Sequence, residues 1–496
     1  MAALAPNPTK PPWRAGRACA KPHRRQARRR PRRHRVCRQR TTCGPRRAAQ
    51  RHRTIRGTPC RRNHRRSSTP PPRSRRCLRL GPARPVGLAA SRRRRKASQA
   101  THLATSYACR SRVGRRPPAR HRARCRPPTM RGNIVKITRV ESILLAIPYE
   151  DHGGIWRLAG THKQFQTLLV RIDTDQGVSG WGEVFTKNGE LALKAIFDMH
   201  VAPALIGRDA TQINVIKRDL ERLHHNFGRV GLLAFCVSAV DLALWDILGK
   251  AAGLPLYRLL GGSARHELPL YASMVRYGSG PAAAKACERL AREGYGALKL
   301  HEVLVETVGA SRQAIGPDVK LMLDTNCPWT LAEAKRNAKL MEPHDLLWLE
   351  EPTWPPENVH ALAKLRRSTS IPIAAGENAG SLADYRIMFE AGAVDIVQPD
   401  IAKAHGLSEA IRIAALADAF DVQFMPHCFM IGAGYVHTIH LAAALDVPLL
   451  ERLAVDLAAE PMGELVKPRN GKVALPQGPG LGCEPDADAI RLYRVG

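Results

Sequence analysis

Ionisable residues recur at a regular spacing in the C-terminal half of the chain, each at the end of a short apolar run. Such regularity predicts repeated structural units that bring equivalent positions to one place. The side chains are of the types that bind metal ions and transfer protons. The residues are Asp324, Glu350, Glu377, Asp400, His427 and Glu451, and successive members are 26, 27, 23, 27 and 24 positions apart. Lys299 and His301 lie about one further interval before Asp324.

The first three acids of this series are candidate metal ligands. Asp324, Glu350 and Glu377 end three successive units, and three carboxylates in one space repel one another unless a cation joins them. A set of hard oxygen ligands favours Mg²⁺. A single acid at a strand end could instead cap a helix or pair with a basic loop, but three at unit spacing favour the metal site. Alternation with the preceding apolar residues favours Glu350 over Glu351 as the inward ligand, and Asn326 is expected to support Asp324 rather than bind the metal.

The remaining residues of the series suit proton transfer. His427 and Asp400 end neighbouring units, so the carboxylate could orient the imidazole and raise its basicity. Lys299 and His301 are two residues apart on one predicted strand and therefore share a face. Glu451 is a candidate proton donor or hydrogen-bonding partner for a substrate carboxylate. A single histidine in a barrel is often structural, but an acid on the adjacent strand and a facing metal site favour the catalytic role.

The elements that would position these residues form a repeating pattern. Eight short apolar runs between residues 268 and 455 alternate with helical patterns, which is typical of a (β/α)8-type barrel with strands covered on both faces. We therefore predict an α/β fold with the barrel at 266–480. Its clearest helical patterns cover residues 331–341, 357–367, 381–391 and 407–420.

A smaller α+β domain is predicted at 130–265, before the barrel. Two stretches with alternating apolar and polar residues indicate an antiparallel sheet. Long stretches with helical periodicity follow at 190–206, 211–225 and 231–252, the last ending at Gly253. Residues 481–496 are predicted to return to this domain.

Several sequence motifs occur in order along this part of the chain, and together they resemble the enolase superfamily. From about 134 to 494, the chain is similar to the mandelate racemase subgroup of the mandelate racemase/muconate lactonizing enzyme family. The motifs are LWDILGKAAGLPLYRLLGG, DTN, WLEEP, AAGEN, QPD, PHC and GPGLG.

The resemblance implies that the α+β domain caps the barrel and that Mg²⁺ binds Asp324, Glu350 and Glu377. It also implies a His427–Asp400 base, with Lys299 on the other face and Glu451 as the acid near the substrate carboxylate. Loops of the capping domain set the substrate in this family. The corresponding loop here is 149–164, with His152, Arg157, His162 and Lys163, which suit a polar or anionic distal group unless the loop is simply solvated. A homo-oligomer is expected.

One position departs from the family pattern. Its commonest second-strand motif is Lys-x-Lys with the second lysine as base, and this chain has His301 there. Histidine has a lower pKa and a shorter reach than lysine, which argues against a strict two-base racemase.

These features predict a shared chemical step, the removal of a proton alpha to a carboxylate with stabilisation of the enediolate. The leading hypothesis is a Mg²⁺-dependent acid-sugar dehydratase, and its partner is a small carboxylate substrate. The alternative is a racemase, epimerase or lactone cycloisomerase that uses His301 and His427 as opposed acid-base groups.

The charge of the chain is concentrated in residues 1–129. They contain 41 of the 79 Lys and Arg residues and no Asp or Glu, whereas the rest has 38 basic and 42 acidic residues, which excludes a uniformly basic nucleic-acid-binding enzyme. This segment lacks hydrophobic periodicity and is predicted to be disordered. It could be a nucleic-acid-binding tail, a transit peptide, or upstream DNA translated from an early start codon. The third interpretation is favoured because arginine outnumbers lysine 38 to 3 and Met130 precedes the first strand. Nucleic-acid binding, the second functional alternative, requires that the tail be real.

The sequence contains no run of 18 apolar residues, so we expect no membrane span and a cytoplasmic enzyme. The cysteines lack CxxC spacing, which argues against a disulfide framework or a zinc site.

Overall fold

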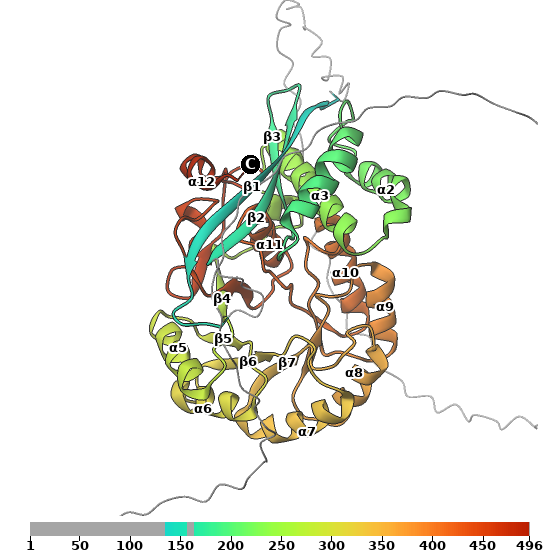
Figure 1. Cartoon of the computed structure of the whole chain (residues 1–496). Helices are drawn as coiled ribbons and strands as arrows, with labels where there is room; N and C mark the ends of the chain where they lie inside the picture. The colour runs from blue at the N-terminus through green and yellow to red at the C-terminus, as the bar shows by residue number, and fades with distance from the viewer. Residues whose placement is uncertain (1–133, 156–162, 496) are drawn as a thin grey trace, which may run out of the picture. The chain divides into compact units, whose positions relative to one another are not determined.

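A computed structural model describes residues 134–155 and 163–495 (Figure 1). The Arg-rich segment, with the interpretations attached to it, lies outside the described residues. The described chain contains an antiparallel sheet with helices packed on it, followed by a ring of strands and helices. This arrangement confirms the predicted α/β fold with a (β/α)8-type barrel and an α+β capping domain.

The capping domain is built on an antiparallel sheet with the order β12-β1-β2-β3. The first two strands pair along almost their whole length, from Ile137 opposite Thr174 to Pro148 opposite Gln164. Alternate residues of this sheet face a buried core shared with the helices. Its elements are β1 (Ile137–Glu150), β2 (Gln164–Thr174), β3 (Ser179–Val184), α1 (Glu190–Ile196), α2 (Ile213–Leu223), α3 (Leu232–Ala252) and α4 (Leu256–Leu259). A π-helical turn (Phe197–Val201) and two 3₁₀ turns (Ala202–Ala204, His225–Phe227) connect the helices.

Helix α3 is the central helix of this domain. It ends at Gly253, which adopts the left-handed conformation (φ 67°) at the predicted position. Among the described helices it alone is long and apolar enough to cross a membrane. However, 78% of the apolar 18-residue stretch that meets this criterion is buried inside the protein. It also carries Asp241 and Asp246, which are buried and hydrogen-bonded to backbone amides. These properties are those of a core helix.

The barrel contains all eight predicted strands, in the order β10-β9-β8-β7-β6-β5-β4-β11. Neighbouring strands are parallel. No ladder joins β10 to β11 within the described residues, but the amide of Cys428, just after β10, donates to Glu451 Oε2 in β11 (2.9 Å). The strands are β4 (Glu267–Ser273), β5 (Ala297–Leu300), β6 (Lys320–Asp324), β7 (Leu346–Glu350), β8 (Ile373–Ala375), β9 (Ile396–Val397), β10 (Gln423–Phe424) and β11 (Leu450–Leu453).

Helices form the outer ring of the barrel and cover the strands (Figure 1). Three of them, α7, α8 and α9, begin at a side-chain cap, such as the capping box of Thr330 and Glu333 at α7. They are α5 (Gly280–Arg292), α6 (Val305–Ile315), α7 (Leu331–Met341), α8 (Val359–Arg366), α9 (Leu382–Glu390), α10 (Leu407–Ala419) and α11 (Ala433–Ala444). Two 3₁₀ turns (Glu342–His344, Glu464–Val466) complete the connections.

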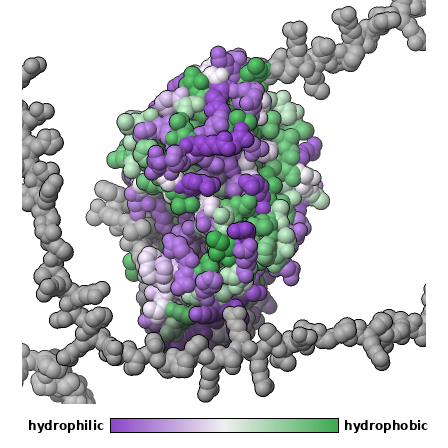
Figure 2. Space-filling model, turned by 90° about the vertical axis from the view of Figure 1, so that its right-hand side faces the viewer, coloured by the Kyte–Doolittle hydropathy of each residue, from purple (hydrophilic) through white to green (hydrophobic). Residues whose placement is uncertain are grey.

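The C-terminal residues return to the capping sheet. Strand β12 (Asp456–Leu457) pairs with β1, β13 (Lys472–Ala474) pairs with β4, and α12 (Ala487–Tyr493) contacts β1. The amide of Val495 donates to the carbonyl of Leu144 in β1 (2.8 Å). The surface in Figure 2 is a mosaic of hydrophilic and hydrophobic patches, as is usual for globular proteins.

Candidate active site

Three carboxylates meet at the carboxyl ends of the barrel strands. Asp324 ends β6, Glu350 ends β7, and Glu377 follows β8 by two residues. One oxygen of each lies within 4.8 Å of the others, and all three residues are buried. Buried hard oxygen donors at this separation could hold a divalent cation such as Mg²⁺.

Lys299 lies beneath this cluster and is fully buried in β5. Its Nζ is 2.9 Å from Glu350 Oε1, 2.8 Å from Glu451 Oε1 and 3.6 Å from Asp324 Oδ2. Burial acts to lower the pKa of Lys299, but the charges of Glu350 and Glu451 raise it well above the ordinary value. The ammonium therefore stays charged.

The three carboxylates have different proton affinities. Burial raises the pKa of Glu350 to about 7, although Lys299 counteracts it. Burial also acts on Asp324, but the charges of His301 and Lys299 outweigh it and lower the pKa to about 2. Oε1 of Glu350 pairs with Lys299, whereas Oε2 accepts hydrogen bonds from two neutral groups, Trp348 Nε1 and Gln398 Nε2, each at 2.8 Å.

His427 lies between two acids. Its Nδ1 is 2.7 Å from Asp400 Oδ2, and its Nε2 is 2.7 Å from Glu377 Oε2. Burial opposes protonation, but the charges of Glu377 and Glu451 raise the pKa of His427 well above the usual value. The Asp400 carboxylate fixes the orientation of the ring, as an orienting acid does for a catalytic histidine.

His301 has the expected place beside Lys299 but engages a metal-ligand candidate. Its Nε2 is 3.1 Å from Asp324 Oδ2, and its Nδ1 contacts the carbonyl of Met274. Asn326 supports the same carboxylate, because its backbone N and Nδ2 lie 2.8 and 3.0 Å from Asp324 Oδ1.

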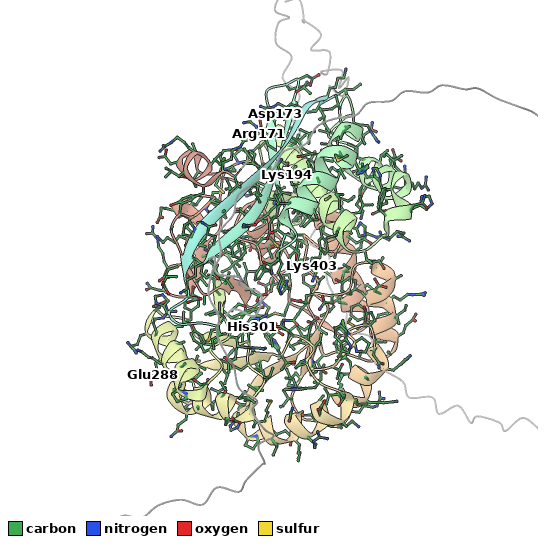
Figure 3. The ribbon with its side chains drawn as sticks, in the orientation of Figure 1. Arg171, Asp173, Lys194, Glu288, His301 and Lys403 are labelled. Carbon is green, nitrogen blue, oxygen red and sulfur yellow. The ribbon has the colours of Figure 1, made fainter. Side chains whose placement is uncertain are left out.

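A cavity of about 310 Å³ opens above these groups. In Figure 3, His301 and Lys403 lie toward the inside of the barrel, whereas Glu288 lies on α5 at the periphery. Apolar residues, one serine and two cationic residues, contributed by both domains, form the rest of the cavity wall. Its lining includes His301, Asp324, Asn326, Glu377, His427 and Glu451 with Ile155, Lys187, Ser273, Met274, Val275, Arg276, Phe429 and Leu453.

The predicted specificity loop is only partly described. His152 Nε2 is 2.6 Å from Asp456 Oδ2, and Lys163 Nζ is 3.0 Å from Asp151 Oδ1, so both bind acids of their surroundings and do not line the cavity. Arg157 and His162 lie outside the described residues.

Sequence reasoning missed two cationic residues of the wall, Lys187 and Arg276. Arg276 follows β4, so the rule of ionisable residues at strand ends, applied to all eight strands, could have found it. Lys187 comes from the loop after β3, and its Nζ lies 5.2 Å from the centre of the Phe429 ring. The sequence contains no signal that this loop reaches the barrel.

A further acid, Glu351, lies beside the cluster, and the sequence pattern set it aside in favour of Glu350. Glu351 is buried and accepts both 2.8 and 2.9 Å contacts from Asn378 Nδ2. Burial and the charge of Glu377 raise the pKa of Glu351 to about 8, so this residue is largely protonated at neutral pH. The assignment of Glu350 rather than Glu351 as a metal ligand stays a prediction.

Comparison with known proteins gives concordant matches. Residues 155–261 match the "Mandelate racemase / muconate lactonizing enzyme, N-terminal domain" family, and residues 282–489 match "Enolase C-terminal domain-like". The chain is 33% identical over 348 residues to the D-galactarolactone cycloisomerase of Agrobacterium fabrum, which covers 66% of this chain and 91% of the relative. It is 32% identical over 355 residues to the D-galactonate dehydratase of Variovorax paradoxus, with 65% and 90% covered. The crystal structure of a racemase from Streptomyces coelicolor with bound magnesium is 29% identical, with a TM-score of 0.65 and 72% and 100% covered.

Proposed function

Because the chain belongs to the mandelate racemase and muconate lactonizing enzyme family of the enolase superfamily, and is thus an enzyme of the lyase or isomerase type, we propose that it dehydrates an acid sugar. The reaction starts with removal of the proton alpha to the substrate carboxylate. The substrate is a small polyhydroxy carboxylate, and the enzyme is expected to act as a cytoplasmic homo-oligomer.

The donor set fits Mg²⁺, which Asp324, Glu350 and Glu377 would hold. When bound, the cation supplies positive charge that stabilises the enediolate oxygens. Lys299 adds a positive charge next to this site, and the carboxylates of Glu350 and Glu451 hold its ammonium group in place. Glu377 also contacts His427, so this carboxylate would serve both the cation and the histidine.

His427 is the residue that we assign to proton transfer at the reacting carbons. Asp400 holds its ring in place, its other nitrogen contacts Glu377, and both His427 and Glu377 line the cavity. Lys299 favours the developing negative charge on the substrate carboxylate, which lowers the barrier to removing the alpha proton. Glu451 contacts Lys299 and the Cys428 amide and lines the cavity, which supports the role assigned to it near the substrate carboxylate.

Dehydration balances without an external reactant. His301, which also lines the cavity, takes the alpha proton, the bond between the beta carbon and its hydroxyl breaks, and the hydroxyl takes a proton from His427 to leave as water. The resulting enol tautomerises to a 2-keto-3-deoxy acid. The observation that carries this proposal is the 2.7 Å pair of His427 and Asp400 beside the three-carboxylate cluster.

Isomerisation is the second candidate. His301 and His427 both line the cavity from different strands, so two acid-base groups are available to a substrate between them. The relative from Agrobacterium fabrum is named a cycloisomerase. A racemase, an epimerase or a lactone cycloisomerase would use the same alpha-proton step and return a proton to carbon instead of expelling water.

Proton NMR of the full chain with Mg²⁺ in D₂O tests the two candidates on galactonate, xylonate, galactarate and its lactone. New methylene signals of a 3-deoxy product are expected from dehydration. Loss of the alpha-proton signal or conversion of the lactone without methylene signals would replace dehydration by isomerisation.

Two variants make this test specific to the site. H427N should lower the rate by about 10²- to 10⁴-fold, the usual contribution of a positioned acid-base group. R386Q is the matched control, since Arg386 is exposed on α9 and pairs only loosely with Glu390 (3.7 Å). Equal rates for H427N and the wild type would refute the assigned role.

A further inference from the structure

Two barrel helices, α10 and α11, start with glycine at the N-cap position. Neither Gly406 nor Gly432 has a side chain that could accept a hydrogen bond from the first amides of its helix. These amides have no partner within the helix and need an acceptor from elsewhere. In both helices a buried carboxylate of the capping domain accepts them.

Glu183, in β3 of the capping sheet, serves α11. Its Oε2 accepts hydrogen bonds from the amides of Gly432 (3.0 Å) and Gly434 (2.9 Å), while Oε1 accepts the hydroxyl of Thr167. The residue is 1% exposed. A Cβ at Gly432 would lie 2.7 Å from Leu169 Cδ2. Glycine therefore allows β2 and β3 to approach the helix start closely.

Asp241, in α3, serves α10 in the same way. Its Oδ2 accepts the amide of Ser408, in the first turn of the helix, at 3.0 Å. Gly406 has φ +86°, and a Cβ there would lie 2.3 Å from Asp241 Oδ2. The close approach of the carboxylate thus depends on glycine at the N-cap.

Both capped helices directly follow the loops that carry the proton-transfer pair. Only a few residues separate Asp400 from Gly406, and the same holds for His427 and Gly432. The Asp400 loop is a tight turn, with the Ala404 amide donating to the Asp400 carbonyl at 2.8 Å. A shift of either helix start would therefore move one member of the pair.

We propose that Glu183 and Asp241 are positioning residues, which hold the loops of His427 and Asp400 at the 2.7 Å separation of the pair. The capping domain then aligns the proton-transfer groups of the barrel as well as covering its mouth. This inference rests on the proposed function, because the alignment affects rate only if the pair moves protons.

A third buried acid of the capping domain provides the matched control. Asp246 lies on α3 like Asp241, is 0% exposed, and accepts the amides of Trp181 (3.0 Å) and Leu481 (2.8 Å). Neither amide belongs to a loop that carries His427 or Asp400. Loss of Asp246 should destabilise the protein without displacing the pair.

The experiment compares E183A, E183Q, D241A and D246A in the full chain, at matched folded fraction judged by thermal melting. E183A and D241A should lower kcat by about 100-fold with little change in KM, since misplacing a catalytic group by about 1 Å has this effect. E183Q should recover most of kcat, because its amide oxygen can still accept both glycine amides. D246A should keep kcat within about threefold of the wild type, because neither of its partner amides lies in the loops of His427 and Asp400.

A second measurement does not need turnover. The rate at which diethyl pyrocarbonate modifies His427, followed by peptide mass spectrometry, should rise in E183A and D241A but not in D246A. Unchanged modification rates in E183A and D241A would overturn the positioning role even if no substrate were found. A loss of kcat in D246A equal to that in E183A would overturn it as well, because the effect would then reflect general destabilisation.

Discussion

His440, buried in α11 away from the active site, should make the protein sensitive to acid. Its Nδ1 accepts the amide of Tyr257 (3.3 Å), and its Nε2 donates to the carbonyl of Leu481 (3.1 Å). This pattern fits only the neutral ring, because a proton on Nδ1 would face the Tyr257 N–H. Burial lowers the pKa of His440 to about 4.

The size of the effect follows from the difference between the folded and unfolded forms. The folded pKa is depressed, so the unfolded chain, with an imidazole pKa of about 6.5, binds the proton first as the pH falls. The stability due to the neutral ring is present above pH ~6.5 and is lost as the pH falls toward about 4. We expect His440 to account for a loss of about 2 kcal/mol at pH ~5 and about 3 kcal/mol at pH ~4.

The assay measures the free energy of unfolding in urea between pH 7 and 4 for the wild type and H440N. Asparagine can accept the Tyr257 amide and does not titrate, so H440N should be less stable at pH 7 but lose less on acidification. Subtracting the two pH profiles removes the titrating groups that do not interact with His440; the exception is His437, whose pKa the charge of His440 helps to lower. Parallel profiles between pH 6.5 and 4 would refute the assignment of a neutral buried ring.

Three further predictions concern the active site and its supports. Removing divalent cations with EDTA should lower Tm, because Asp324, Glu350 and Glu377 then repel one another. The decrease in Tm should be smaller in E350Q, which has one charge fewer. An unchanged Tm in calorimetry would argue against a metal site. K299M should abolish turnover and destabilise the protein by about 3 to 5 kcal/mol, because it leaves the buried carboxylates Glu350 and Glu451 without the lysine ammonium that pairs with them. Urea unfolding measures the loss of stability. A stable, active K299M would contradict the placement of this charge. G406A should cost about 1 to 3 kcal/mol, since its φ of +86° strains alanine and the Cβ meets a carboxylate; a melting temperature equal to that of the wild type would show that the loop relaxes freely.

The barrel could be predicted from the sequence because its signal is local and repeated. Each strand is a short apolar run with an ionisable end, and the parallel order follows from the helices between the runs. The end of α3 was equally predictable, since Gly253 supplies the left-handed conformation that closes a helix. The meeting of Asp324, Glu350 and Glu377 follows from the same geometry, and their roles as ligands stay a prediction.

The contacts between the two domains could not be predicted. Lys187 reaches the cavity, and Glu183 caps α11 about 250 residues further along the chain, but nothing near either residue in the sequence signals its partner. The partners of His152 and Lys163 depend in the same way on how the 149–164 loop lies against its surroundings. Such pairings depend on tertiary packing, which periodicity and spacing do not encode.

The Glu451 side chain, which accepts the Cys428 amide, has two structural roles. It fastens the last two strands of the barrel, where no ladder joins them in the described chain, and it borders the substrate cavity. A mutation that retunes substrate preference at this position therefore also alters how firmly the ring is closed. Glutamine keeps an oxygen that can accept the Cys428 amide, so E451Q is the replacement that laboratory evolution can use here. Smaller residues would lose this hydrogen bond, and any new selectivity would come with a weaker connection between β10 and β11.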